Sequence, residues 1–296
     1  MNRSILAVVL SIFALSTIGP FVRLFSMDVP LPIISFFRAF FGFALVICVV
    51  PFVDKNFLRV NTNDVRDYAI VGFLLALTIT LFNSALVIAP LTDVYFLNFL
   101  HVFAAPILAL IFLKEKMSIP MIGLTILGFA GIAFIDPLTG QSPTGNILAL
   151  GAGLSYATMV VFMRRVDKKH GLGDVVWFLG FASLFLGLNA IPSDWGGIPF
   201  PSFVGMAIMG IISTGLGYLF INYALENLPV HTVSMVDLIV TPILATLFSV
   251  FLFHETISQN VMLGGGFIIL AGVLFSYHAR AMGRGLKRAR RTNSSA

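Results

Sequence analysis

A few polar residues stand inside long apolar segments of this chain, where they could bind a solute or carry a proton. Arg38 lies about seven residues into one such segment, roughly 10 Å deep at 1.5 Å per residue. Its guanidinium can bind a carboxylate through two parallel hydrogen bonds. Alternatively, Arg38 is structural and holds Asp93 or the backbone carbonyls of a broken turn. Charges within hydrocarbon are costly and usually functional, so Arg38 is a candidate binding residue.

Asp237 and His101 are the residues best suited to proton transfer, because a buried carboxyl group or imidazole can titrate near neutral pH. Asp237 could also bind the ammonium group of a solute. Its structural alternative is a carboxylate near a helix start, satisfied by backbone N–H groups or by His231. His101 could equally be a neutral side chain with a hydrogen bond across a helix bundle.

Helical spacing groups the other candidates. Tyr95, Asn98 and His101 follow one another at intervals that place them on one helix face, so we expect them to line a cavity. Asn83 and Asn222 occupy matched places in a repeat described below, where the favoured interpretation is a structural bond to backbone across a helix contact. The remaining candidates are Ser155, Tyr156, Thr158 and Trp177. A place at a membrane interface would also explain the tryptophan.

No catalytic, metal or cofactor site is predicted. The five histidines, at positions 101, 170, 231, 254 and 278, include no pair at metal-ligand spacing. The glycines at 264–266 lack the Lys-Ser/Thr that follows in a phosphate-binding loop. The chain is therefore not expected to be an enzyme.

Ten apolar runs must position these residues. Hydrophobic residues make up 58% of the 296 and charged residues only 10%, whereas a soluble domain carries about 25% charged residues. A bilayer core of about 30 Å takes about 20 apolar residues per helix. Division at Pro, Gly and charge clusters predicts spans at residues 5–26, 31–53, 68–88, 91–113, 118–136, 145–164, 173–191, 201–224, 231–253 and 260–280.

The basic residues predict the orientation of these spans. With a cytoplasmic N-terminus, sixteen of the 18 lysines and arginines fall on the cytoplasmic side, Arg23 falls outside and Arg38 within a span. This partition predicts a multi-pass protein of a prokaryotic plasma (inner) membrane with both termini cytoplasmic. The basic tail from Arg280 to Arg291 is expected to contact anionic lipid headgroups, and no nucleic acid is expected.

Short motifs recur about 140 residues apart. The segment 82–86 (FNSAL) matches 221–225 (INYAL), and 115–118 (EKMS) matches 255–258 (ETIS). Glu115 and Glu255 stand at turns before serines that are predicted to cap helices, so we expect both glutamates to bond neighbouring helix ends and not a solute.

The repeat predicts an inverted architecture. Five spans per repeat is an odd number, so the second repeat must lie upside down relative to the first. Inverted repeats are typical of alternating-access transporters, in which one half moves against the other about a central site. We predict an all-α membrane protein of ten helices, with one repeat in residues 1–140, an inverted one in 141–280 and a basic cytoplasmic tail in 281–296.

The two halves resemble EamA domains of the drug/metabolite transporter superfamily over nearly the whole chain. The resemblance rests on the Pro-x(12)-Glu ending from Pro242 to Glu255, on the Glu-x-x-Ser turns and on the Gly-rich helices after them. It also rests on Arg38 in the segment SFFRAF, which is similar to the family's second-helix arginine. Val102 stands in the first-half place of Pro242, with Pro106 nearby, so the kink in the fourth span is expected to be displaced.

The resemblance implies a secondary-active transporter, as an exporter or exchanger of small metabolites such as amino acids, that works by alternating access around a cavity between the repeats. The alternative is a multidrug or toxic-compound efflux carrier, and an intramembrane enzyme or a receptor fits less well. The expected partners are a small-molecule solute and the lipid bilayer. The protein is expected to be a monomer or a homodimer.

Overall fold

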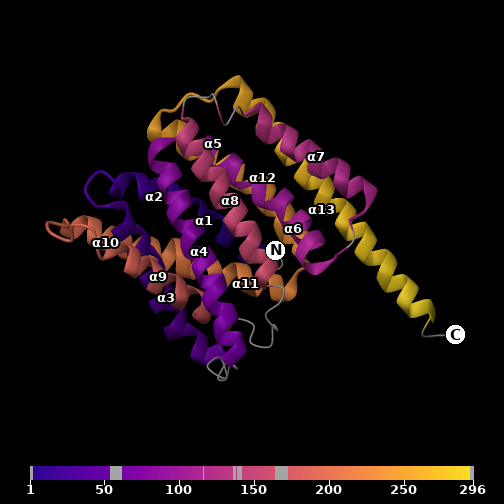
Figure 1. The fold of residues 1–296 in the computed structure, drawn as a ribbon, viewed down its shortest axis with the longest axis horizontal. Coiled ribbons are helices and arrows are strands. Elements are labelled where there is room, and N and C mark those ends of the chain that lie inside the picture. Colours follow the sequence, from indigo (N-terminus) through magenta and orange to yellow (C-terminus); the bar gives the residue numbers. More distant parts are fainter. Residues whose placement is uncertain are drawn as a thin grey trace.

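The secondary structure of the described residues is entirely helical, which confirms the predicted fold class (Figure 1). The computed structural model describes the backbone of residues 3–53, 62–115, 117–135, 138, 142–163 and 173–293, and the side chains of all of these except 62–63, 230–231 and 279–293. The predicted repeat boundary at 140 lies outside the described residues, as do the side chains of the basic tail. So do the loop residues Lys55, Arg59, Lys116, Arg164, Arg165, Lys168 and Lys169.

Nine helical segments of the described chain are long and apolar enough to cross a membrane. In the first half they are α1–α2 (Arg3–Ser16, Ile18–Phe25), α3 (Leu31–Val53), α4 (Thr62–Ile88) and α5–α6 (Leu91–Asn98, Leu100–Leu113). In the second half they are α8 (Pro143–Met163), α9 (Gly173–Ala190), α10–η1–α11 (Phe200–Ile208, Met209–Leu216, Gly217–Asn227), α12 (Val230–Phe253) and α13 (Gln259–Asn293). The tenth predicted span is α7 (Ile119–Phe134), an apolar helix of 16 residues.

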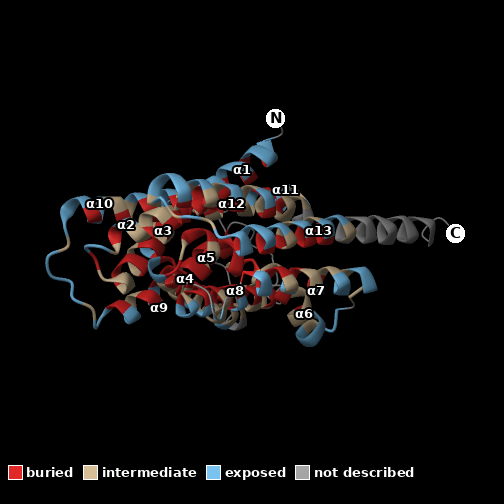
Figure 2. Cartoon of the chain, turned by 90° about the horizontal axis from the view of Figure 1, so that it is seen from above, coloured by how far each residue is buried: buried red, intermediate tan, exposed pale blue. Residues whose placement is uncertain are grey.

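The outer faces of the bundle carry large apolar side chains. Phe52 is 87% exposed, Phe251 70% and Phe13 53%. Exposure of such large apolar side chains is unfavourable in water but not in lipid. Figure 2 shows the buried residues gathered along the inside of the bundle and the exposed ones on its outer surface. The protein is therefore a multi-pass membrane protein.

The repeat is visible in the turns that end the fourth and ninth spans. Lys114 and His254 both cap their helices in the left-handed conformation, with φ of 54° and 53°. The N–H of Glu115 bonds the carbonyl of Ala109, as the N–H of Glu255 bonds that of Ser249. Two turns 140 residues apart therefore have the same backbone.

Helix packing follows the same repeat. Helix α4 of the first half packs along α8 of the second, and the corresponding α11 packs along α1. Helices α3 and α9, which are second in their repeats, pack on each other, and the last helices α7 and α13 lie side by side (Figure 1). The third helix of each half thus packs against the first helix of the other half, so the two halves form one bundle.

The buried apolar residues distinguish the two ends of the bundle. The Arg23 end is the end near residues 23–31, 86–91, 190–200 and 249–259, and the Ser118 end is the opposite one, where Ser118 bonds His278. At the Arg23 end one continuous cluster joins both halves and includes Val22, Phe25, Leu86 and Leu91. Toward the Ser118 end the core divides into one cluster around α3, α4 and α9 and another around α1, α11 and α12.

The contact between α7 and α13 is made backbone to backbone through two glycines. A Cβ atom at Gly264 would lie 2.5 Å from the carbonyl oxygen of Gly131, and one at Gly131 would lie 2.8 Å from that of Gly264. Neither backbone can give way without moving its helix. Small residues are the usual means of close helix approach in membranes.

We predict that Gly264→Ala separates α7 from α13 and destabilises the protein. Overpacking of this kind costs about 1–3 kcal/mol, which a thermal denaturation midpoint in detergent will report as a decrease. The matched control is Gly266→Ala, two residues along the same helix, where nothing lies within 4 Å of an added Cβ. Equal midpoints for the two variants would contradict the glycine contact.

Candidate functional site

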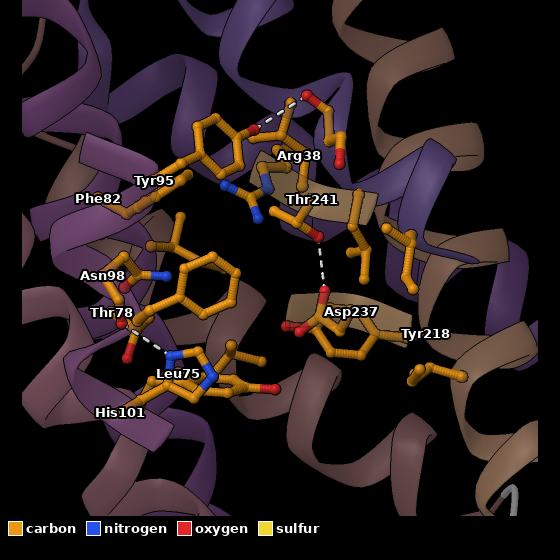
Figure 3. Close-up of a pocket in the computed structure, with 18 residues that line it drawn as sticks. Arg38, Leu75, Thr78, Phe82, Tyr95, Asn98, His101, Tyr218, Asp237 and Thr241 are labelled. Atoms are coloured by element: carbon orange, nitrogen blue, oxygen red, sulfur yellow. Dashed lines mark hydrogen bonds between the residues drawn. The ribbon is translucent and has the colours of Figure 1, made fainter. Parts of the chain in front are cut away.

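A cavity of about 180 Å³ lies between the two halves, where the core divides. Its wall combines polar groups and aromatic rings from the first, second, third, fourth, sixth, eighth and ninth spans (Figure 3). The polar side chains in the wall are Ser16, Arg38, Thr78, Tyr95, Asn98, His101, Tyr156, Tyr218, Asp237 and Thr241.

The first span is broken beside the cavity. Pro20 has no N–H to bond the carbonyl of Ser16, the residue four positions earlier, so that carbonyl needs another donor. The Tyr95 hydroxyl donates to it at 2.9 Å and accepts from the N–H of Gly19 at 3.3 Å. One tyrosine from α5 therefore satisfies both backbone groups at the break.

The fourth span is broken at Phe99, between α5 and α6. The N–H of Val102 bonds the carbonyl of Phe99 and not that of Asn98, so the Asn98 carbonyl is left without its helical partner. A ring nitrogen of His101 lies 2.7 Å from this carbonyl oxygen. On the other side Gly153 of α8 approaches so closely that a Cβ there would lie 2.7 Å from the same oxygen. The break precedes Pro106 by seven residues, whereas α12 runs unbroken through Pro242.

The eighth span contains a π-helical segment, η1, at the level of Arg38. A π-helix widens the turn and often marks a functional site. Here it brings Thr214 and Gly210 against α3: a Cβ at Gly210 would lie 3.0 Å from the carbonyl oxygen of Arg38. Thr214 Oγ1 accepts a hydrogen bond from Arg38 Nε at 3.2 Å.

Arg38 is 5% exposed and all of its hydrogen-bond partners are neutral. Besides Thr214, Asn83 Oδ1 accepts from Nη1 at 2.9 Å, and Asn83 Nδ2 donates to Ser35 at 2.9 Å. In the described part of the chain no carboxylate lies within 4 Å of the guanidinium. The alternative in which Arg38 holds Asp93 or backbone carbonyls is therefore wrong.

Asp237 faces the same cavity from α12 (Figure 3). The Thr241 hydroxyl donates to its Oδ1 at 2.6 Å, and among the described residues no lysine or arginine lies within 4 Å of its carboxylate. It sits seven residues after the start of the helix at Val230. The alternative of a helix-start carboxylate satisfied by backbone N–H groups is therefore wrong. The side chain of His231, the other partner considered, lies outside the described residues.

His101 lies in the cavity wall with its ring edge-to-face against Tyr156, at 4.9 Å between centroids. Together with Tyr95 and Asn98 it forms the predicted polar stripe, although the stripe crosses the helix break and does not follow one straight helix face. No group of three or more His, Cys, Asp or Glu residues that could hold a metal ion occurs within the described ranges.

The matched asparagines differ in role. Asn83 lies behind Arg38 and bonds two side chains, whereas Asn222 Nδ2 donates to the carbonyl of Tyr218 in its own helix at 2.8 Å. The prediction that both asparagines bond backbone across helix contacts is wrong. In the second repeat Phe178 and Leu179 stand where Arg38 stands in the first, so Asn222 has no arginine to bond.

Besides these two asparagines, three further candidates lie outside the cavity wall. Ser155 donates to the carbonyl of Leu74 in α4 at 2.9 Å and so joins two helices, whereas Thr158 donates to the carbonyl of Leu154 in its own helix at 2.8 Å. Trp177 stacks on Tyr68, with centroids 6.1 Å apart. The predicted serine cap also differs: Ser258 Oγ accepts from the N–H of Val261, but Ser118 makes no such bond.

Six polar residues in or near the cavity wall escaped the sequence analysis. Ser16, Thr78, Tyr218 and Thr241 lie in the wall, Thr214 lies beside Arg38, and Thr17 bonds Ser213 through its hydroxyl at 2.7 Å. The four-residue spacing of Asp237 and Thr241 is a signal that could have identified the threonine. The contact between Arg38 and Thr214 spans 176 residues, and no local pattern predicts it.

Known proteins place this chain among transporters. The EamA-like transporter family matches residues 2–135 and again 143–277. The chain is 26% identical to an uncharacterized transporter of Archaeoglobus fulgidus, over 92% of this chain and 95% of that one. It is 23% identical to the S-adenosylmethionine uptake transporter of Rickettsia conorii over 85% of each chain. It is 31% identical to the threonine/homoserine exporter of Escherichia coli over 50% of this chain and 52% of that one.

A solved crystal structure has the same fold. It matches with a TM-score of 0.68 at 16% identity, covering 95% of this chain and 99% of that one. The two family matches account for both halves of the bundle, including the broken spans that form the cavity. The chain belongs to the EamA-like transporter family of the drug/metabolite transporter superfamily.

Proposed function

We propose that this protein is a secondary-active exporter or exchanger of a small metabolite, which it moves by alternating access through the cavity between its two repeats. The observation that carries the proposal is the pair Arg38 and Asp237, two charged side chains on one cavity, the first buried and the second half-buried. Their hydrogen-bond partners within the described chain are all neutral. A buried charge without an opposite charge is costly, so a bound solute that supplies one is favoured.

The two charges favour a zwitterion such as an amino acid. A solute carboxylate would bind Arg38, and a solute ammonium group would bind Asp237, with Asn83 and Thr214 holding the guanidinium in place. Relatives named for threonine/homoserine export and S-adenosylmethionine uptake are consistent with solutes of this kind.

The cavity size favours a small metabolite over the efflux alternative. Sites for drug-sized molecules enclose about 300–1,000 Å³, whereas this cavity encloses about 180 Å³. We further propose that the halves at 1–140 and 141–280 are the moving units. The proposed orientation has both termini in the cytoplasm of a prokaryote, with the tail at 281–296 against anionic lipid and the protein a monomer or homodimer.

Counterflow in liposomes tests the function. Purified protein loaded with one unlabelled amino acid is expected to accumulate its radiolabelled form, and neutral zwitterions should compete better than their N-acetyl or methyl-ester forms. Each blocked form lacks one of the two charges that the cavity complements. Absence of counterflow across amino acids, nucleosides and drugs alike would contradict a transporter.

The charge at Arg38 is tested by supplying it with a fixed partner. Asn83→Asp keeps the shape and the hydrogen bond to Arg38 but adds a carboxylate, which should compete with the carboxylate of the solute. We expect half-saturation of counterflow to rise about tenfold, or about 1.4 kcal/mol, with folded yield retained. The matched control is Asn222→Asp, because Asn222 bonds only its own helix. Unchanged saturation in Asn83→Asp would place the solute elsewhere.

Proton coupling is expected to depend on His101 and Asp237. His101→Ala should abolish accumulation driven by a pH gradient while counterflow continues, because exchange needs no net proton movement. Asp237→Asn should impair both, since it also removes the partner of the solute ammonium group. Thr158→Ala, outside the cavity wall, is the control. Gradient-driven uptake that survives both substitutions would remove these residues from coupling.

A further inference from the structure

At the Arg23 end of the bundle, Arg23 of α2 and Glu255 after α12 form an ion pair between the two halves of the chain. The two side chains are 13% and 20% exposed, so water screens the pair little. Among the described residues it is the one ion pair that joins the repeats; the other, Arg66 with Asp67, joins neighbours in sequence.

Arg23 also holds the end of the third span. Its Nε donates to the carbonyl of Leu86 at 2.5 Å and its Nη2 donates to that of Ala89, while the guanidinium lies 5.0 Å from the ring centre of Phe253. The last carbonyls of a helix have no partners within it and carry partial negative charge. A cation is therefore stabilised at this position.

Glu255 holds the start of the fourth span in the complementary way. Its Oε2 accepts from the N–H of Leu91 at 2.9 Å and from the hydroxyl of Ser249 at 2.5 Å. The first N–H groups of a helix carry partial positive charge, so a carboxylate is stabilised there. The predicted role of this glutamate at a helix end is confirmed, and the pair also joins α2, α4, α5 and α12.

The joined helices enclose the largest of the three buried apolar clusters in the described core, and this cluster contains residues of both halves. Val22, Leu86 and Leu91, beside the pair, belong to that one cluster, and the cavity lies on its Ser118 side. A solute could leave toward the Arg23 end only if these helices separated. Helix α5 also carries Tyr95 and Asn98 into the cavity wall, so its movement would reach the site itself.

We propose that the Arg23–Glu255 pair is a lock that keeps the solute path closed at the Arg23 end and must break for the cavity to open there. This inference rests on the proposed alternating access. It assigns to these two residues a conformational role and no contact with the solute.

The lock is tested by access to the cavity from each side of sealed vesicles. In a Cys48→Ser background, Ser16→Cys puts a thiol in the cavity wall at a hydroxyl that has no hydrogen-bond partner in the described structure. Asp194→Cys, in the exposed loop at the Arg23 end, identifies the side. A charged, impermeant thiol reagent from that side should react with Ser16→Cys at least about tenfold faster when Glu255→Gln or Arg23→Gln is added.

Three comparisons make the outcome decisive. The double variant should react no faster than the single ones, because both break the same lock. Asp28→Asn removes an exposed charge at the same end and should leave the labelling rate unchanged. Ser249→Ala removes one hydrogen bond to Glu255 without changing a charge, so it tests the lock if a charge variant fails to fold. Unchanged rates, or equal increases from both sides, would overturn the lock. Labelling needs no solute, so this result is independent of whether counterflow is observed.

Discussion

Lipid offers no hydrogen bonds, so every backbone group freed inside the bundle must find a partner within the protein. This constraint explains why the cavity is built where it is. Two of its walls are broken spans, and in each the freed carbonyl is bonded by a side chain that also faces the cavity: Tyr95 for Ser16, and His101 for Asn98. The residues that complete the backbone and the residues that would meet a solute are the same residues.

The two halves share their backbone arrangement, and the cavity residues lie where their sequences differ. The two αL turns and the two proline-initiated helices are almost superimposable in backbone conformation. Arg38, by contrast, has no counterpart, since Phe178 and Leu179 are buried apolar residues. A pocket between two identical halves would present the same charge twice. This one presents a cation from the second span and an anion from the ninth.

The number of spans, the repeat and the main cavity residues could be predicted from the sequence because each leaves a local trace. Twenty apolar residues, an offset near 140 or a charge inside an apolar run can be read without knowing the packing. Pro20 was also visible, but the partner of the carbonyl it frees lies 79 residues away. The π-helical segment and the pairing of Arg23 with Glu255 depend on contacts between spans, which no single stretch of sequence records.

The glycine contact between α7 and α13 has a mechanical consequence. Where two helices interlock through side chains, a change in their crossing angle forces rotamers out of their packed positions. Gly131 and Gly264 meet as bare backbone, and the buried side chains of Ile135 and Ile268 pack against them. A change in the angle between the last helices of the two halves would therefore turn about this backbone contact, and the side chains it would have to displace there include those of the two isoleucines.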